Sequence, residues 1–362
     1  MNLIAVGINH KTAPIQIREK FFLSSTEQDL FLTELKCNPA VTEAFVLSTC
    51  NRIEIYANVL KTENHFTHFI QLLAQIKKLT FDPAMANHFY AYKGKEAVRH
   101  LLTVSTGLDS LVLGEKQILG QLKTSLERAQ SKGMFHKSFN ILSNLAIRTG
   151  KKAQTETDIS FGGSSISWAA VVMAEKLLQS LEDKKILIMG MGKMGEMAIR
   201  QFRDKKAEKI YLMNRTPSTA DTLAQKFSCL SAAFCDIKET LSEVDLAICS
   251  TDAPHYILDK ETIEKIMALR VHRTPRPLIL MDISMPRNID PLVAELPNVH
   301  LTHIDDLENV VQETMRKRQK AIGLVEKIIE DKLQEFYSKF VGRPSEKPTK
   351  AASLNEEFPV SL

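Results

Sequence analysis

The sequence predicts a multidomain α/β protein: a mixed N-terminal domain, a doubly wound parallel sheet in the middle, and a long C-terminal helix. Strand-like and helical segments alternate from residue 166 to residue 282, and a glycine-rich turn follows the first of those strands. Helical periodicity then runs from Asp305 to about Phe340. A length of 362 residues fits two or three domains.

The N-terminal part shows the periods of both strands and helices. Ser25 or Thr26 is expected to cap a helix that begins near Glu27. We expect strands at 3–8, 45–48 and 53–57, and helical segments at 65–79, 95–104 and 117–155. The first domain is therefore predicted to be mixed α/β with a helical second half.

The middle part alternates strictly after a junction at 162–165, where the sequence reads Gly-Gly-Ser-Ser. Predicted helices at 166–181, 196–205, 218–227 and 260–269 alternate with predicted strands at 185–189, 210–213, 246–250 and 278–282. Strands separated by single helices indicate a parallel, doubly wound sheet.

The C-terminal part is predicted to be one amphipathic helix followed by a disordered tail at 341–362, rich in Pro, Lys, Glu and Ser. The apolar stripe of the helix consists of Leu307, Val311, Ile322, Val325, Ile329, Leu333 and Phe336. An exposed stripe of this length suggests a second copy of the chain as its partner. The alternative is that the helix folds back on its own protein.

The composition excludes several classes of protein. No apolar run approaches the roughly 20 residues of a membrane helix, and the N-terminus lacks the pattern of a signal peptide. The five cysteines are scattered without a C-x-x-C pair, which argues against a disulfide framework or a zinc ribbon and favours the reducing cytoplasm. The histidine pairs His65/His68 and His300/His303 lack nearby ligands, so no metal site is expected.

A glycine-rich turn predicts a dinucleotide site of Rossmann type. It reads Gly190, Met191, Gly192, Lys193, Met194, Gly195. This G-x-G-x-x-G pattern is weak alone, but here it follows an apolar strand and opens a helix, whose N–H groups can bind a pyrophosphate. A tight turn without a ligand is the alternative reading.

The end of the next strand indicates which dinucleotide binds. An NAD site usually has a carboxylate there for the ribose 2′-hydroxyl, whereas this sequence has Asn214, Arg215 and Thr216. A guanidinium suits a 2′-phosphate through paired, charge-assisted hydrogen bonds. NADPH is therefore the predicted cofactor.

Cys50 is the strongest candidate for a reactive thiol. It lies in the polar cluster Ser48-Thr49-Cys50-Asn51-Arg52 at the end of an apolar strand. The nearby charge of Arg52 is expected to favour the nucleophilic thiolate. A buried, inert cysteine is the alternative.

Two further features allow more than one interpretation. From spacing alone, His100 is interpreted as an ordinary half-buried histidine. The segment 107–121, which contains well-spaced glycines, is interpreted as a helix–loop–helix or as a substrate loop.

These motifs together resemble the glutamyl-tRNA reductase family. The resemblance rests on the segments 7–14, 48–54, 107–121, 190–195, 214–216 and 282–287, and it runs in order over about residues 3–340. Lys116 and the junction Ser160-Phe161-Gly162-Gly163 depart from the family's usual residues.

The resemblance implies a function for each site residue. Cys50 would attack the ester of glutamyl-tRNA(Glu) and form a thioester, which hydride from NADPH reduces to glutamate-1-semialdehyde, the precursor of 5-aminolevulinate. His100 would support catalysis or transfer a proton. Substrate-binding positions would be Thr49, Asn51, Arg52, Ser110, Glu115, Lys116, Gln117 and Gln121. Among them, Arg52 would bind the substrate carboxylate and Glu115 its ammonium group.

The resemblance also implies the domain plan and the partners. Residues 1–157 would form the catalytic domain, 158–303 the NADPH domain and 304–340 a dimerisation helix. The predicted partners are glutamyl-tRNA(Glu), a second copy of the chain, and the next enzyme of the pathway, glutamate-1-semialdehyde aminomutase. The net charge of +4 permits an RNA partner without implying one.

Two other functions remain open from the sequence. A dehydrogenase similar to shikimate dehydrogenases would use the same cofactor half and would need no cysteine nucleophile. A non-catalytic, tRNA-binding regulatory protein could use the basic run at 316–320, although a charged helix face is usually only solvated.

Overall fold

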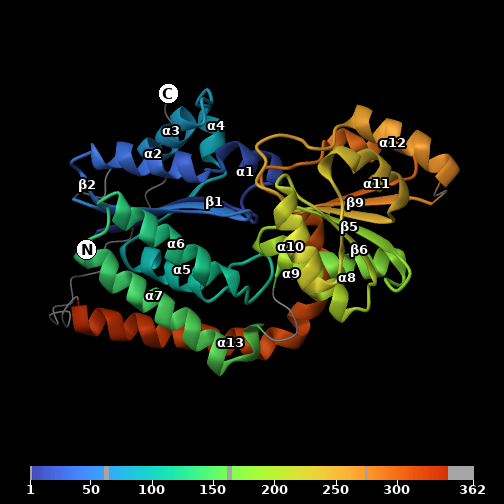
Figure 1. Ribbon diagram of the computed structural model, residues 1–362. Helices are drawn as coiled ribbons and strands as arrows, with labels where there is room; N and C mark the ends of the chain where they lie inside the picture. The colour runs from blue at the N-terminus through green and yellow to red at the C-terminus, as the bar shows by residue number, and fades with distance from the viewer. Residues whose placement is uncertain (1, 61–64, 161–164, 274–275, 341–362) are drawn as a thin grey trace.

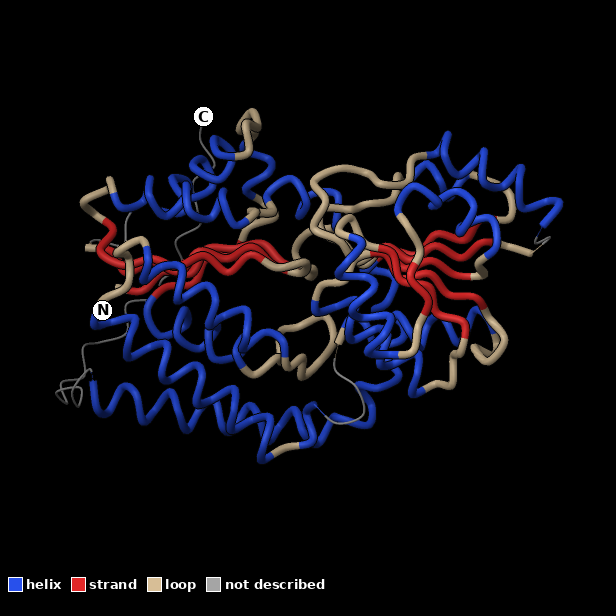
Figure 2. The backbone as a smooth tube through the Cα atoms, viewed as in Figure 1, coloured by secondary structure: helices blue, strands red, loops and turns tan. Residues whose placement is uncertain are grey.

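Two sheets lie side by side above one long helix in the computed structural model, which describes residues 2–60, 65–160, 165–273 and 276–340 (Figures 1 and 2). The strands are β1 Leu3–Asn9, β2 Val41–Ser48, β3 Arg52–Val59, β4 Tyr90–Lys93, β5 Lys185–Met189, β6 Lys209–Met213, β7 Leu230–Ser231, β8 Leu246–Cys249, β9 Leu278–Asp282 and β10 Val299–His303. The α-helices are α1 Ile15–Phe21, α2 Ser25–Lys36, α3 His65–Ile76, α4 Pro83–Ala86, α5 Gly94–Ser105, α6 Gln117–Ser131, α7 Lys137–Glu156, α8 Ile166–Leu178, α9 Lys193–Asp204, α10 Pro217–Phe227, α11 Ile237–Glu243, α12 Lys260–Arg273 and α13 Glu308–Phe340. Short 3-10 turns are η1 Asp158–Ser160, η2 Phe234–Asp236, η3 Pro291–Glu295 and η4 Ile304–Leu307.

The first sheet is antiparallel, in the order β2-β3-β1-β4. Helices α2 and α3 cover one face, and α5, α6 and α7 cover the other (Figure 1). The predicted cap of α2 is wrong by one residue: Ser24 caps it in a reciprocal capping box with Glu27. The helix predicted at 117–155 is two helices, because the chain turns at Gly133, whose φ is +71°.

The second sheet is parallel, in the order β10-β9-β8-β5-β6-β7, which confirms the doubly wound prediction. Strands β5 and β9 begin and end at the predicted residues. The strand order reverses between β5 and β8, so a crevice is expected beyond their carboxyl ends. The predicted junction at 162–165 lies outside the described residues except for Ser165, which caps α8.

Helix α13 forms as predicted, but its apolar stripe is not exposed. Val325, Ile329 and Leu333 are buried in the core of the first domain, where α13 packs against α5 and α7 (Figure 1). The alternative that the helix folds back on its own protein is therefore what the structure shows. Leu307 is buried in the second domain's core instead. The side chain of Val311 and the tail 341–362 lie outside the described part of the chain.

Leu333→Ala should lower the free energy of unfolding by about 2–5 kcal/mol, because the side chain is fully buried. Leu324→Ala, at a position 53% exposed on the same helix, should change it by about 0.5 kcal/mol or less. Urea denaturation at several protein concentrations measures both. A loss for Leu333→Ala that depends on protein concentration would mean that the stripe packs against a second copy.

Candidate active site

Cys50 lies at the tip of the hairpin that joins β2 to β3. The backbone N–H of Thr49 donates to the carbonyl of Arg52 at 2.8 Å, which leaves Cys50 and Asn51 as the turn. The Thr49 hydroxyl accepts from the N–H groups of Asn51 and Arg52, both at 3.2 Å. Side-chain bonds to nearby N–H groups hold such turns in one shape. The thiol is therefore presented on a rigid tip.

Arg52 is 1% exposed and is already bound to two carboxylates of the protein. Its Nη1 donates to Glu54 Oε1 at 2.7 Å and to Asp109 Oδ2 at 2.9 Å. Its Nη2 donates to the backbone carbonyl of Asp109. A buried guanidinium needs such partners, because an unpaired buried charge costs several kcal/mol. Arg52 thereby ties the segment 107–121 to the base of the hairpin.

Glu54 connects Arg52 to His100. It accepts hydrogen bonds from Tyr56 at 2.7 Å and from Tyr90, and His100 Nε2 lies 2.9 Å from its Oε1. Burial alone would raise the pKa of Glu54, but the charge of Arg52 holds it well below its usual value. Within the described residues, the hydrogen bonds of His100 lead to Glu54 and not to the thiol. A proton-transfer role for His100 therefore stays a prediction.

The ligand atoms of Glu54, His100 and Asp109 lie within 4.8 Å of one another, a spacing that would suit a metal ion. However, the Arg52 Nη1 bonds both carboxylates. The Arg52 guanidinium is therefore the cation of this cluster, whose geometry is that of an ion-pair network.

The surroundings of Cys50 oppose the expected thiolate in this arrangement of the domains. Burial, reinforced by the charge of Glu115, raises the pKa of Cys50 to about 12, although Arg18 and Arg52 oppose it. The half-buried thiol packs against the same apolar cluster as Met191 and Met194 of the glycine-rich turn. The hairpin tip therefore packs against the core of the domain that carries the glycine-rich turn.

The segment 107–121 lies between the two domains. Its first half is a closed loop, since Gly114 N donates to Gly107 O at 3.0 Å. A Cβ at Gly114 would lie 2.1 Å from the carbonyl of Ile159. Leu111 and Val112 are buried in the second domain's core. These two buried side chains therefore hold the segment against the cofactor domain.

The predicted substrate positions divide into two groups. Ser110 and Glu115 are buried beside the hairpin, and burial raises the pKa of Glu115 to about 7 while Arg52 opposes the rise. Gln117 donates to Met197 of α9 and so faces the cofactor domain. Lys116 is exposed, and Gln121 is half-buried one turn into α6.

The glycine-rich turn has the shape that a dinucleotide needs. Gly190 has φ +96°, and a Cβ on it would lie 2.2 Å from the carbonyl of Ser250 after β8. Gly192 has open space where a Cβ would be, and no side chain caps the first turn of α9. The helix N–H groups are thus available to a pyrophosphate. These residues fit the phosphate part of a nicotinamide dinucleotide.

The end of β6 also faces this turn. Asn214 Oδ1 accepts from the N–H of Met191 at 3.3 Å, which joins the second strand to the glycine-rich turn. Arg215 and Thr216 are exposed. Arg215 makes no hydrogen bond or ion pair with the described residues, so its guanidinium is available to a ligand.

The sequence identifies the segment 7–14 as a motif but gives its residues no role, and it does not predict helix α1. Lys11 and Asn9 bind the carboxylate of Asp109, and Arg18 binds the backbone carbonyl of Cys50 at 2.7 Å. Helix α1 has only seven residues, too few for a clear periodic stripe. Pro14, immediately before it, is the one signal that could have indicated it.

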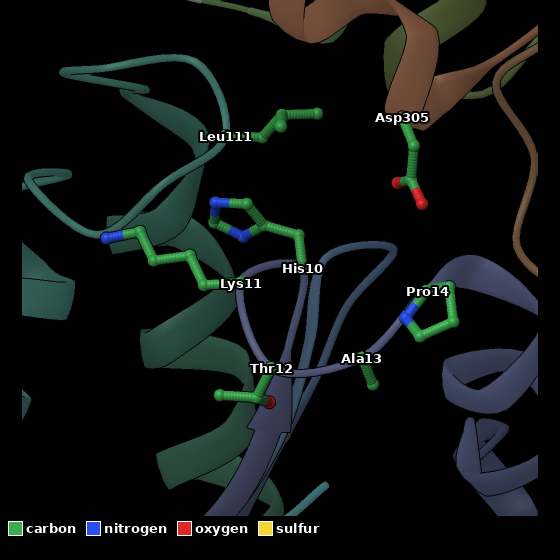
Figure 3. A pocket seen from close by; sticks show the side chains of 7 residues that line it. All are labelled: His10, Lys11, Thr12, Ala13, Pro14, Leu111 and Asp305. Atoms are coloured by element: carbon green, nitrogen blue, oxygen red, sulfur yellow. The ribbon is translucent and has the colours of Figure 1, made fainter.

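A cavity of about 330 Å³ opens between this first loop and the second domain (Figure 3). Leu111 crosses above the ring of His10, and the carboxylate of Asp305 points toward Ala13 and Pro14. Burial and the charge of Arg52 lower the pKa of His10 to about 3. The imidazole of His10 and the carboxylate of Asp305 therefore line two walls of this cavity, and the low pKa favours the neutral form of the imidazole.

Comparison with protein families matches two consecutive parts of the chain. Residues 6–157 match the family described as "Glutamyl-tRNAGlu reductase, N-terminal domain". Residues 172–310 match "Shikimate / quinate 5-dehydrogenase". No helix within the described residues combines the length and the apolar character of a membrane span.

Individual relatives give the same result. The chain is 39% identical to the glutamyl-tRNA reductase of Thermodesulfovibrio yellowstonii over 93% of this chain and 79% of that protein. It is 38% identical to that of Bacillus subtilis, over 93% and 73%. A solved structure of glutamyl-tRNA reductase from Methanopyrus kandleri is 31% identical, with a TM-score of 0.51, over 93% of this chain and 80% of that chain.

Glu115→Gln should stabilise the protein at pH 8 but little at pH 5. The folded-state pKa of about 7 lies above the usual 4.5, so folding disfavours the ionised form and wild type loses stability as pH rises through this interval. The gain should be about 3 kcal/mol at pH 8 and about 1 kcal/mol at pH 5. Urea denaturation measures it, with Glu127→Gln, an exposed position on α6, as the control. An equal gain at both pH values would contradict the burial of an ionisable Glu115.

Proposed function

The chain belongs to the glutamyl-tRNA reductase family, and from that premise we propose that Cys50 is the residue that takes the glutamyl group from glutamyl-tRNA(Glu). The enzyme reduces glutamyl-tRNA(Glu) to glutamate-1-semialdehyde and releases tRNA(Glu), the first step of 5-aminolevulinate and tetrapyrrole synthesis by the C5 pathway. One observation carries the assignment to Cys50: its thiol packs in the same apolar cluster as Met191 and Met194 of the dinucleotide turn.

The reaction divides into two steps at Cys50. Its sulfur forms a bond to the ester carbonyl carbon, the bond from that carbon to the tRNA ribose oxygen breaks, and the thiol proton ends on the released ribose hydroxyl. A nicotinamide cofactor held by the glycine-rich turn would supply the hydride that reduces the thioester to the aldehyde. The Cys50 sulfur then leaves as thiolate and regains its proton from solvent. Covalent capture of this kind replaces one difficult step with two easier ones. Burial of the thiol between the domains keeps water from the thioester.

Substrate binding rests on an exchange of carboxylates. In the structure the Asp109 carboxylate forms an ion pair with the Arg52 guanidinium. The substrate carboxylate replaces Asp109 there, and Asp109 keeps its ion pair with Lys11. Glu115 forms no ion pair with the described residues, and it pairs with the substrate's ammonium group. Thr49, Asn51 and Ser110 contribute polar contacts around the same point. His100 has a supporting role through Glu54.

The cofactor is a nicotinamide dinucleotide, and we assign it as NADPH. The exposed Arg215 at the end of β6 supports this assignment, because its guanidinium can bind a 2′-phosphate. Residues 1–157 serve as catalytic domain and 158–303 as cofactor domain, a division that the family matches at 6–157 and 172–310 support. The five free cysteines suit a cytoplasmic enzyme.

The remaining partner assignments have less support. A homodimer and a contact with glutamate-1-semialdehyde aminomutase are still predictions. Within its described side chains, the apolar stripe of α13 is covered by α5 and α7, so a second copy would use another surface. The shikimate dehydrogenase likeness is confined to 172–310, and it therefore explains the cofactor half alone.

Cys50→Ala should lower NADPH oxidation with glutamyl-tRNA(Glu) by on the order of 10³-fold or more, because the acyl acceptor is lost. Cys37→Ala, which removes an exposed thiol, should keep wild-type activity. Consumption of NADPH is followed by absorbance in both variants. Equal turnover by Cys50→Ala and wild type would favour the dehydrogenase alternative, and binding of tRNA without NADPH consumption by wild type would favour the regulatory one.

Arg215→Ala should raise KM for NADPH about 10–100-fold and leave KM for NADH unchanged, since a charge-assisted contact to a phosphate is worth about 1.5–3 kcal/mol. Lys238→Ala, which removes an exposed charge on α11, serves as the control. Steady-state kinetics with each dinucleotide measures the ratio. An unchanged preference between them would refute the 2′-phosphate assignment.

A further inference from the structure

Arg18 is a fully buried cation that none of the sequence motifs accounts for. Its Nη1 donates to the carbonyl oxygen of Cys50 at 2.7 Å and to Asn51 Oδ1 at 3.5 Å, and its Nε donates to Ala13 O at 3.2 Å. Its Nη2 forms an ion pair with Asp305. One guanidinium thus binds both residues of the hairpin tip and a carboxylate at the base of α13.

Asp305 belongs to the cofactor side of this contact. It lies in η4 between Ile304 and Leu307, both of which are buried in the second domain's core. Asp305 Oδ2 also accepts from the N–H of Ile15 at 3.2 Å. Pro14, which precedes α1, provides no side-chain cap, so Asp305 caps this helix from the other domain.

The residue after Arg18 makes a second ion pair to the cofactor domain. Glu19 accepts from Arg287 Nε at 3.0 Å and from Arg287 Nη2 at 2.6 Å. Arg287 follows β9 and is nearly buried. Helix α1 therefore contacts the cofactor domain through two ion pairs, in which it contributes one cation, Arg18, and one anion, Glu19. Arg18 also binds the backbone carbonyl of Cys50.

We propose that Arg18 is a positioning residue for the Cys50 turn, and that its ion pair with Asp305 makes the position of the nucleophile depend on the seating of the cofactor domain. This proposal rests on the assignment of Cys50 as the acyl acceptor. When the two domains are in contact, Asp305 holds Arg18, and Arg18 holds the carbonyl of Cys50 against the second domain. The thioester is reduced in the state with the two domains in contact. Cys50 attacks the tRNA ester in the state with the domains apart.

The Asp305 end of this ion pair is open to water. The Asp305 side chain is 34% exposed and borders the cavity between the domains (Figure 3), so its carboxylate is readily rehydrated. Arg18 keeps its three acceptors in the first domain when Asp305 leaves. Its charge then acts on the Cys50 turn without a compensating carboxylate, which favours the thiolate needed for attack.

Asp305→Asn tests the proposal, because it removes the charge but keeps the shape and a hydrogen-bond acceptor. Two single-turnover rates are measured with glutamyl-tRNA(Glu): release of tRNA without NADPH, and oxidation of NADPH by the preformed glutamyl-enzyme. We expect tRNA release within about twofold of wild type and NADPH oxidation about tenfold slower, as for loss of one charge-assisted hydrogen bond. An equal loss in both rates, or no loss in either, would overturn the proposal.

Asp306→Asn is the matched control. Asp306 lies on the same turn and is exposed, and its carboxylate accepts from His303 N at 2.6 Å without touching Arg18. Both of its rates should stay near wild type. If Asp306→Asn reproduced the effect of Asp305→Asn, the effect would come from the turn and the proposal would fail.

A double-mutant cycle with Arg18→Lys tests whether the two residues act through one link. Lysine keeps the charge but cannot bind Cys50 O and Asp305 together. The NADPH oxidation rate of Arg18→Lys/Asp305→Asn should match that of the slower single variant, whereas multiplied losses would overturn the proposal. If Arg18→Lys does not fold, the Asp305→Asn rates decide alone. Wild type that releases no tRNA and oxidises no NADPH would refute the proposed function instead.

Discussion

The burial of the Arg52 guanidinium is the constraint on which the active site depends. A charge that is 1% exposed must be paired, and the partners come from β3 and from the segment 107–121. That pairing brings the segment to the hairpin that carries Cys50. Glu54 extends the pairing to Tyr90 and His100. The first domain is thus arranged around one compensated cation, the residue that we propose binds the substrate's carboxylate.

The parallel sheet imposes the second constraint. Its strand order reverses between β5 and β8, and the glycine-rich turn lies at that point. A hydride can reach only a few ångströms from a cofactor bound there, so the acyl group must come to this edge. Leu111, Val112 and Cys50 pack against the second domain's core, so the hairpin and the segment 107–121 contact the domain that carries this turn. The proposed Arg18–Asp305 link then relates this contact to the position of the nucleophile.

The parts of the fold that were predictable are those with a strong local pattern. Strands β5 and β9 are buried parallel strands that read as continuous apolar runs. Strands β4 and β7 and helix α1 are short and lack a periodic stripe, and they were missed. The sequence predicted the apolar stripe of α13, but it did not show which surface the stripe packs against. A second copy and the chain's own α5 and α7 offer the same apolar chemistry, so sequence could not separate them.

By itself, the sequence identified the thiol, the glycine-rich turn and Arg215, because each depends on residues that are adjacent in the chain. The tertiary structure decided the electrostatics. It placed Cys50 where burial and Glu115 raise the pKa of the thiol, against the opposing charges of Arg18 and Arg52. It also paired Arg52 with Asp109 and Arg18 with Asp305. Burial and long-range charge pairing depend on distances in space between residues far apart in sequence, and no local pattern encodes those distances.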